Sequence, residues 1–118
     1  MQKRILIAED HLQTREAMIS SALSEGYSVV SATDGLEYLS AVSKEKFDLI
    51  ITDLIMPDLN GVSATEIMKL GGDDTPIIAV TALSTNDVSQ FKDKFVKIFH
   101  KPIDIRELFE YIKATLEK

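Results

Sequence analysis

Three short apolar runs constrain the fold of this 118-residue chain more than any other feature. They are Ile5-Leu6-Ile7-Ala8, Leu49-Ile50-Ile51 and Ile77-Ile78-Ala79-Val80. Because they are rich in β-branched residues and do not alternate with polar ones, each is predicted to be a strand covered on both faces, as in the middle of a parallel sheet. Two weaker runs, 28–32 and 96–100, carry polar side chains and are predicted to be edge strands.

Helical patterns fill the intervals between these runs. The apolar stripes are Leu12, Ile19, Ala22 and Leu23; Leu36, Leu39 and Val42; Val62, Ile67, Met68 and Leu70; Val88, Phe91 and Phe95; and Ile105, Leu108, Phe109, Ile112 and Leu116. Helix starts are predicted at Asp34, Ser63, Ser84 and Asp104, each of which has an acidic residue three positions later. Five strand–helix repeats predict a doubly wound α/β fold, flavodoxin-like (βα)5 with strand order 2-1-3-4-5, and one domain over 1–118.

Composition excludes several classes of protein. The net charge of −6 argues against direct nucleic-acid binding. The chain has no cysteine, which excludes disulfides and thiolate metal sites and fits a cytoplasmic protein. No apolar stretch approaches the roughly 18 residues that a membrane helix needs, so no membrane association is expected.

Charged and polar side chains follow four of the predicted strands directly. In open α/β sheets, ligands bind outside the carboxyl ends of the strands. The first, third, fourth and fifth strands are neighbours in the proposed order, so the residues at their ends are expected to meet at one rim. These residues are Glu9, Asp10, Asp53, Thr81, Ala82 and Lys101.

Three carboxylates packed together repel one another, and a divalent cation removes that penalty. Oxygen ligands without cysteine or histidine favour Mg²⁺, which normally keeps waters and a phosphate oxygen. Lys101 and Thr81 would help the rim to hold a phosphoryl group, whose transfer needs mainly positioning and charge neutralisation. Asp53 is the central acid, and carboxylates form acyl phosphates, so it is the candidate nucleophile.

Four segments resemble the motifs of receiver domains from two-component response regulators. They are Glu9-Asp10 after "ILIA", "TDLIMPDLNG" around Asp53, "VTA" with Thr81, and "KPID" with Lys101. Any one of these motifs is weak alone, but their order and spacing together are specific. The resemblance spans essentially the whole chain.

The resemblance implies that Asp53 accepts a phosphoryl group from a histidine kinase or a histidine phosphotransfer protein. It also implies that Glu9, Asp10, Asp53 and the backbone carbonyl of Ile55 hold Mg²⁺. Lys101 would pair with Asp53 and then with the phosphoryl oxygens, which the Thr81 hydroxyl and the Ala82 amide would also bind. Such a domain modifies itself and turns over no external substrate. It could form a homodimer through the face built from residues 84–112.

Two departures from the family pattern stand out. Ile98 occupies the position three residues before the lysine, where the family usually has an aromatic residue that moves on activation. Phe99 is adjacent but should point to the opposite face. We therefore expect the 84–112 face to move little, or differently. Ile55 and Leu83, two residues after Asp53 and Thr81, are both apolar and cannot orient an attacking water, which predicts slow self-dephosphorylation.

Other interpretations compete with the phosphoacceptor. Haloacid-dehalogenase-type phosphatases need a second aspartate where this chain has Ile55. A phosphate-independent interaction module would keep the fold without the switch, and Ile98 keeps that alternative open. A flavodoxin would need a phosphate-binding loop where Glu9 and Asp10 stand.

Asp58 is expected to be a turn residue and His11 a solvated or capping residue. A stand-alone receiver, a shuttle and a domain of a hybrid kinase all fit the sequence.

Overall fold

The computed structural model describes residues 2–117 as five strands and the helices between them. The strands are β1 (Arg4–Ala8), β2 (Ser28–Ala32), β3 (Leu49–Thr52), β4 (Ile77–Thr81) and β5 (Lys97–His100). The helices are α1 (Leu12–Ser24), α2 (Gly35–Lys44), α3 (Gly61–Leu70), α4 (Thr85–Val88), the 3-10 helix η1 (Ser89–Lys94) and α5 (Ile105–Leu116). All strand pairs are parallel and the order is β2-β1-β3-β4-β5, which confirms the predicted fold class.

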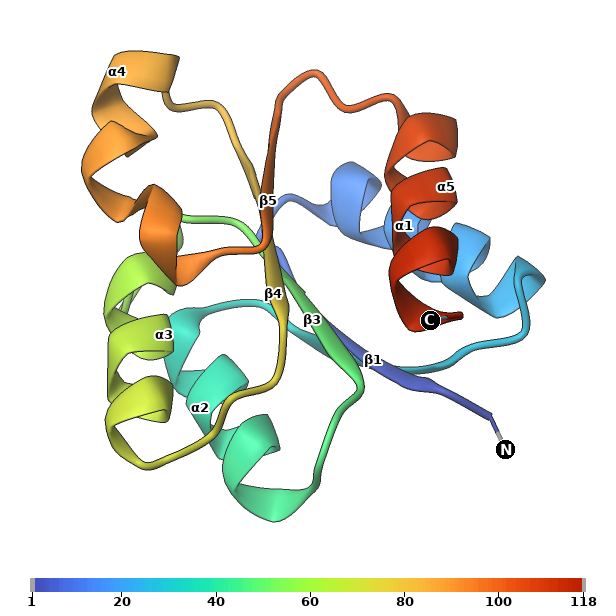
Figure 1. Ribbon diagram of the computed structural model, residues 1–118, viewed down its shortest axis with the longest axis horizontal. Helices are drawn as coiled ribbons and strands as arrows, with labels where there is room; N and C mark the ends of the chain where they lie inside the picture. Colours follow the sequence, from blue (N-terminus) through green and yellow to red (C-terminus); the bar gives the residue numbers. More distant parts are fainter. Residues whose placement is uncertain (1, 118) are drawn as a thin grey trace.

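The sheet separates two helical layers, with α1 and α5 on one face and α2, α3 and α4 on the other (Figure 1). Because side chains alternate along a strand, each central strand contributes side chains to two hydrophobic cores, one on each face of the sheet. In β1, Ile5 and Ile7 join the core under α1 and α5, while Leu6 and Ala8 join the core under α2 and α3. The three apolar runs therefore lack polar alternation because both faces of their strands are covered, as predicted.

The edge strands are β2 and β5, which correspond to the two weaker runs predicted to lie at the edges. In β5, Ile98 packs against the core beneath α2 and α3, whereas Phe99 packs on the α5 side. The Phe99 ring meets Tyr111 edge-on, with ring centroids 5.8 Å apart. Phe99 thus points away from the position of Ile98, and it cannot take over the place of the missing aromatic residue.

Three of the four predicted helix starts are confirmed, since Asp34, Ser84 and Asp104 each accept a hydrogen bond from the backbone N–H three residues on. The start predicted at Ser63 is wrong. Asn60 caps α3 instead, and its Oδ1 accepts from the Ser63 N–H at 2.9 Å. The helix begins at Gly61 because asparagine is as good a cap as serine and stands earlier in the chain.

Several apolar residues of the predicted stripes are exposed. In α1 the buried residues are Met18 and Ala22, while Leu12 and Leu23 face solvent. In α3 the exposed apolar residues are Ile67 and Leu70, the latter at 89% exposure.

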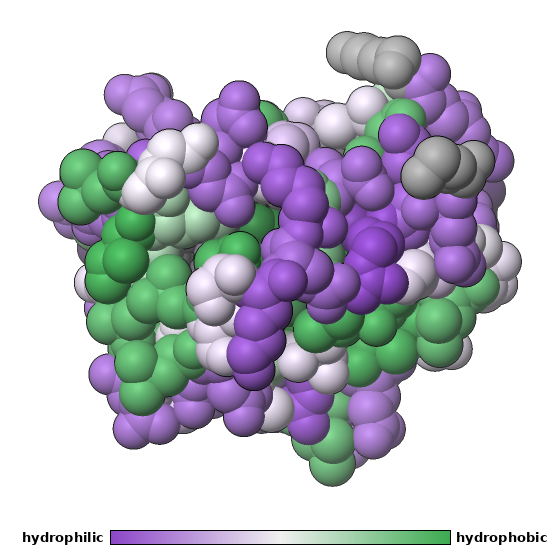
Figure 2. Space-filling model, turned by 90° about the horizontal axis from the view of Figure 1, so that it is seen from below, coloured by the Kyte–Doolittle hydropathy of each residue, from purple (hydrophilic) through white to green (hydrophobic). Residues whose placement is uncertain are grey.

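The α2–α3 side of the molecule, at the left of Figure 2, has an apolar surface. A groove of about 420 Å³ between these two helices is lined partly by Leu39, Val42 and Met68.

The segment after β4 also differs from the expected helix. The segment that contains Val88 and Phe91 folds as the four-residue α4 followed by the six-residue η1. Phe95 is buried just after the end of η1. Among residues 2–117, no helix is both long and apolar enough to cross a membrane.

Candidate phosphoacceptor site

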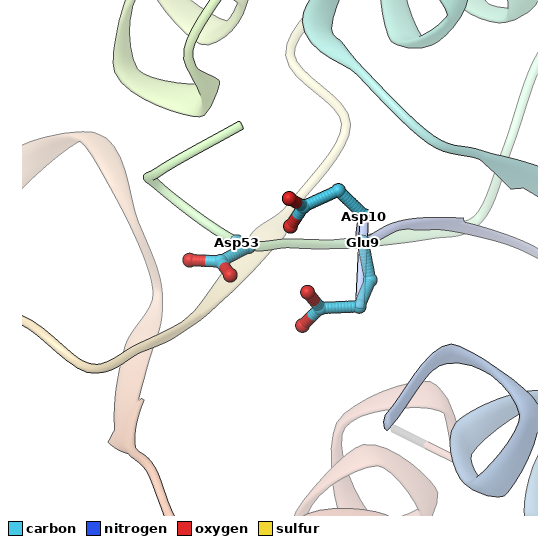
Figure 3. A group of neighbouring side chains, drawn as sticks. All are labelled: Glu9, Asp10 and Asp53. Carbon is cyan, nitrogen blue, oxygen red and sulfur yellow. The ribbon is translucent and has the colours of Figure 1, made fainter. Parts of the chain in front are cut away.

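Three carboxylates meet where β1 and β3 end. Glu9 and Asp10 follow β1, and Asp53 follows β3. The ladder continues one residue past the strands, because the Asp53 N–H donates to Ala8 O at 2.9 Å. One carboxylate oxygen from each of the three residues lies within 4.8 Å of the others, and the side chains extend to the same side of the sheet edge (Figure 3).

Both oxygens of the Asp53 carboxylate are held. Its Oδ1 accepts from the Ile55 backbone N–H at 3.1 Å, and its Oδ2 accepts from Lys101 Nζ at 2.8 Å. The residue is only 4% exposed. Asp53 is therefore a fixed, nearly buried carboxylate and not a mobile turn residue.

Lys101 reaches the site from the end of β5. Its Nζ lies 2.8 Å from Asp53 Oδ2 and 2.9 Å from Glu9 Oε1. Its backbone N–H donates to Thr81 O at 2.8 Å, which fixes the residue against β4. Burial alone would lower the pKa of the Lys101 ammonium, but the contacts with Asp53 and Glu9 outweigh burial and raise that pKa. The side chain is thus a permanent cation between two acids.

Glu9 is completely buried, and its charge is only partly compensated. Burial raises the pKa of Glu9, against the opposing effects of Lys101 and of the hydrogen bond from the His11 N–H. Lys101 Nζ forms an ion pair with Oε1 at 2.9 Å, and Oε1 has no other polar partner among the described residues. A buried carboxylate with so few partners gains from a further cation.

The site fits a divalent cation on two grounds. Three carboxylates and one ammonium leave a formal charge of −2, and one oxygen from each carboxylate converges on the same place. The three side-chain donors are all hard carboxylate oxygens, which suits Mg²⁺. The residues that the sequence predicted as side-chain ligands are therefore brought together.

Thr81 and Ala82 lie at the same sheet edge, one strand further along. Thr81 is buried at the end of β4, and its Oγ1 accepts from the Leu83 N–H at 3.2 Å. Ala82 is exposed. Among the hydrogen bonds of residues 2–117, none joins Thr81 or Ala82 to Asp53, so the structure places these two on the neighbouring strand end without a hydrogen bond to the acid cluster.

In the loop from β3 to α3, the residue with a left-handed φ is not Gly61 but Asp58, with a φ of 66°. Gly61 matters through space, because a Cβ there would lie 2.0 Å from the Asp53 carbonyl oxygen. Asp58 is exposed and acts as a turn residue, as predicted.

Three contacts of the site were missed from the sequence. Arg15 Nη1 donates to the carbonyl oxygens of Glu9, at 3.0 Å, and Asp10, at 3.3 Å, and so ties the acidic loop to α1. A basic residue in the first turns of the following helix was the available signal. His11 caps α1, as expected of a capping residue, but its N–H also donates to Glu9 Oε2 at 3.1 Å. His100 Nδ1 contacts Leu83 O, and nothing in the sequence indicated that contact.

The fold and this site together define a receiver domain of the two-component class. A family model, the response regulator receiver domain, matches residues 5–113, and the chain belongs to that family. The response regulator MprA of Mycobacterium leprae is 32% identical over 117 residues, which are 98% of this chain and 51% of the relative. The chain therefore spans about half the length of the curated relatives it matches.

Solved structures agree with this assignment. A CheY-like receiver domain protein from Methanospirillum hungatei has 30% identity and a TM-score of 0.88, covering 99% of this chain and 95% of its own. The response regulator TrrA from Thermotoga maritima, solved in complex with Mg²⁺ and BeF, has 30% identity and a TM-score of 0.83, covering 96% and 98%. The predicted family and its role in two-component signalling are thus confirmed.

Proposed function

We propose that Asp53 accepts a phosphoryl group in a histidine-to-aspartate phosphorelay, and that the acid cluster holds Mg²⁺ for this transfer. The observation that supports the proposal most is the placement of Lys101 Nζ between Asp53 and the buried Glu9. The lysine balances one of the three negative charges and leaves the rest for a divalent cation. A donor histidine kinase or histidine phosphotransfer protein follows from membership of the family.

In the proposed transfer, one Asp53 carboxylate oxygen attacks phosphorus while the bond from phosphorus to the donor imidazole nitrogen breaks. The electron pair of that bond returns to the imidazole, and no oxidant or further reactant is needed. Lys101 Nζ, now 2.8 Å from Asp53 Oδ2, would move to the incoming phosphoryl oxygens. The Thr81 hydroxyl and the Ala82 N–H would donate to the same oxygens, which are close to the end of β4.

Glu9, Asp10, Asp53 and the backbone carbonyl of Ile55 would hold the metal. Bound Mg²⁺ supplies positive charge to the phosphoryl oxygens. The net negative charge of the acid cluster and the all-oxygen donor set support this site, and so does the Mg²⁺ complex of the related TrrA. Residues 1–118 are proposed to form one receiver domain, with Met1 and Lys118 outside the described residues.

A phosphatase is the less favoured function. Ile55 stands where a haloacid-dehalogenase-type enzyme needs its general acid, and its side chain is 54% exposed with no titratable group. We infer that the domain modifies itself and keeps the phosphoryl group. A homodimer through residues 84–112 remains a prediction.

Labelling with acetyl phosphate and Mg²⁺, read by intact-mass spectrometry, tests the proposal. Wild type should gain one phosphoryl group, and Asp53→Asn should gain none. Asp58→Asn is the matched control, because it makes the same chemical change in the same loop, and asparagine tolerates the left-handed conformation of that exposed turn. Asp58→Asn should label like wild type. Equal labelling of wild type and Asp53→Asn would defeat the proposal.

A further inference from the structure

Both backbone groups of Leu83, its N–H and its carbonyl, form hydrogen bonds that hold the loop between β4 and α4. The Leu83 N–H donates to Thr81 Oγ1 at 3.2 Å, and the Leu83 carbonyl contacts His100 Nδ1 at 2.9 Å. A carbonyl oxygen only accepts, so His100 Nδ1 must carry the proton. The structure thus contains a continuous chain of hydrogen bonds from the Thr81 hydroxyl through Leu83 to the imidazole of His100.

His100 itself is anchored to the sheet. Its backbone pairs with Thr81 in the β4–β5 register, and the next residue, Lys101, donates its N–H to Thr81 O at 2.8 Å. The ladder fixes the end of β5 relative to β4. The loop is less constrained, because Ala82 and Ser84 on either side of Leu83 are exposed. A displacement at this place therefore moves the loop and leaves the backbone of His100 where it is.

We propose that His100 is a positioning residue that holds the β4–α4 loop in its resting place and releases it when the acceptor aspartate is phosphorylated. This inference rests on the proposed function. In the proposed switch, the loop moves toward the end of β3 so that the Ala82 N–H and the Thr81 hydroxyl bind the phosphoryl group on Asp53. Leu83 then moves away from His100, whose backbone the β4–β5 ladder holds in place.

The hydrogen bond from His100 Nδ1 to Leu83 O, the latch, gives this chain an alternative to the aromatic residue that is missing at position 98. Ile98 packs in the core beneath α2 and α3, so this chain has no aromatic side chain at that position to respond to a movement of Thr81. His100 contacts the same loop from the edge strand and lies on the exposed side of it. Its release changes the exposed surface at the end of β5 while the rest of the 84–112 face stays still.

Ring nitrogen NMR of the two histidines tests the latch directly. At about pH 8.5, well above the ordinary pKa of imidazole, His100 should show the Nδ1–H tautomer. His11 is an internal control with the opposite expectation, because its Nδ1 accepts from the Thr14 N–H and the proton must sit on Nε2. Saturation with Mg²⁺ and beryllofluoride should remove the Nδ1–H preference of His100. A His100 ring that is Nε2–H at rest, or unchanged after saturation, would overturn the proposal.

Substitutions provide the second measurement. His100→Leu removes the donor, whereas His100→Asn keeps an N–H₂ near the position of Nδ1. Since a latch stabilises only the resting loop, His100→Leu should bind beryllofluoride roughly twofold to tenfold more tightly, the range that one neutral hydrogen bond provides. His100→Asn should behave like wild type. Equal affinities for all three proteins, or weaker binding by His100→Leu, would contradict the latch.

Failure of the latch can be separated from failure of the proposed function. If wild type does not respond to beryllofluoride and Mg²⁺ while Asp53→Asn is equally silent, the phosphoacceptor itself is refuted. If wild type responds, Asp53→Asn does not, and the His100 variants respond as wild type does, only the latch is refuted.

Discussion

Gly61 offers a test that links packing to the chemistry of Asp53. A Cβ at this position would lie 2.0 Å from the Asp53 carbonyl oxygen and 2.9 Å from Thr52 Oγ1. The nearer atom is backbone and cannot rotate away, so either β3 or the start of α3 must shift. Overpacking of this kind costs about 1–3 kcal/mol, and a clash with backbone puts Gly61→Ala at the upper end.

The change in stability is measurable by thermal or urea unfolding. A loss of about 3 kcal/mol lowers the midpoint of a domain this size by roughly 10 °C. Gly71→Ala is the neutral control, because its Cβ would have no contact closer than 3.4 Å and its φ of −78° suits alanine. It should unfold within about 1 kcal/mol of wild type.

A second control separates stability from function. In Gly35→Ala the new Cβ would lie 1.9 Å from Leu59 O, so this variant is also destabilised, but the clash is six residues after Asp53 and does not involve the backbone of Asp53 itself. Gly61→Ala should weaken Mg²⁺-dependent beryllofluoride binding in its folded state, whereas Gly35→Ala should weaken it less. The reasoning would be refuted if Gly61→Ala were as stable as wild type. It would also be refuted if Gly61→Ala bound beryllofluoride as tightly as wild type while Gly35→Ala lost much of its affinity for it.

Three further predictions concern pH, lifetime and the outer face. Burial opposes ionisation of Asp73, but hydrogen bonds from Thr75 outweigh burial and lower its pKa below 3.8. Its stabilisation is therefore complete above pH 3.8 and is lost as the pH falls through the lowered pKa, so Asp73→Asn should cost about 1 kcal/mol at pH 7 and progressively less in acid, by urea unfolding. With apolar Ile55 and Leu83 beside the site, the phosphorylated domain should persist for hours in Mg²⁺ by mass spectrometry, and a half-life of seconds would contradict this. Apart from Ser84, His100 and Lys101, which adjoin the moving loop and the phosphoryl group, backbone amides of residues 84–112 should shift little in NMR spectra on adding Mg²⁺ and beryllofluoride, and large shifts across them would show that this face moves.

The sheet and the acid cluster could be predicted because both depend on local sequence. Continuous β-branched runs have few alternatives to a doubly covered strand, and every strand of a parallel sheet delivers its next residue to the same edge. Glu9, Asp53 and Lys101 therefore had to meet once the strand order was right. The order itself followed from three buried strands and two polar ones.

Features that depend on through-space fit could not be predicted. The burial of Met18 in place of Leu12 depends on how α1 is rotated against the sheet, which apolar spacing alone does not determine. The need for Gly61 arises from the approach of α3 to β3, and a sequence shows only that glycine is present. The start of α3 was misjudged because Asn60 and Ser63 are both good caps, and local propensity does not choose between them.

The placement of Lys101 just after an edge strand has a consequence for how the domain folds during synthesis. Its partners Glu9 and Asp53 lie 92 and 48 residues earlier in the chain, so the ion pairs are among the least local contacts of the fold. Such contacts carry a large loop-closure cost and are expected to form late. During synthesis the acids leave the ribosome well before the lysine, and each buried carboxylate opposes compaction until β5 docks. Assembly of the sheet and readiness to be phosphorylated would then be completed in one step, and an incomplete chain would offer a histidine kinase no working substrate.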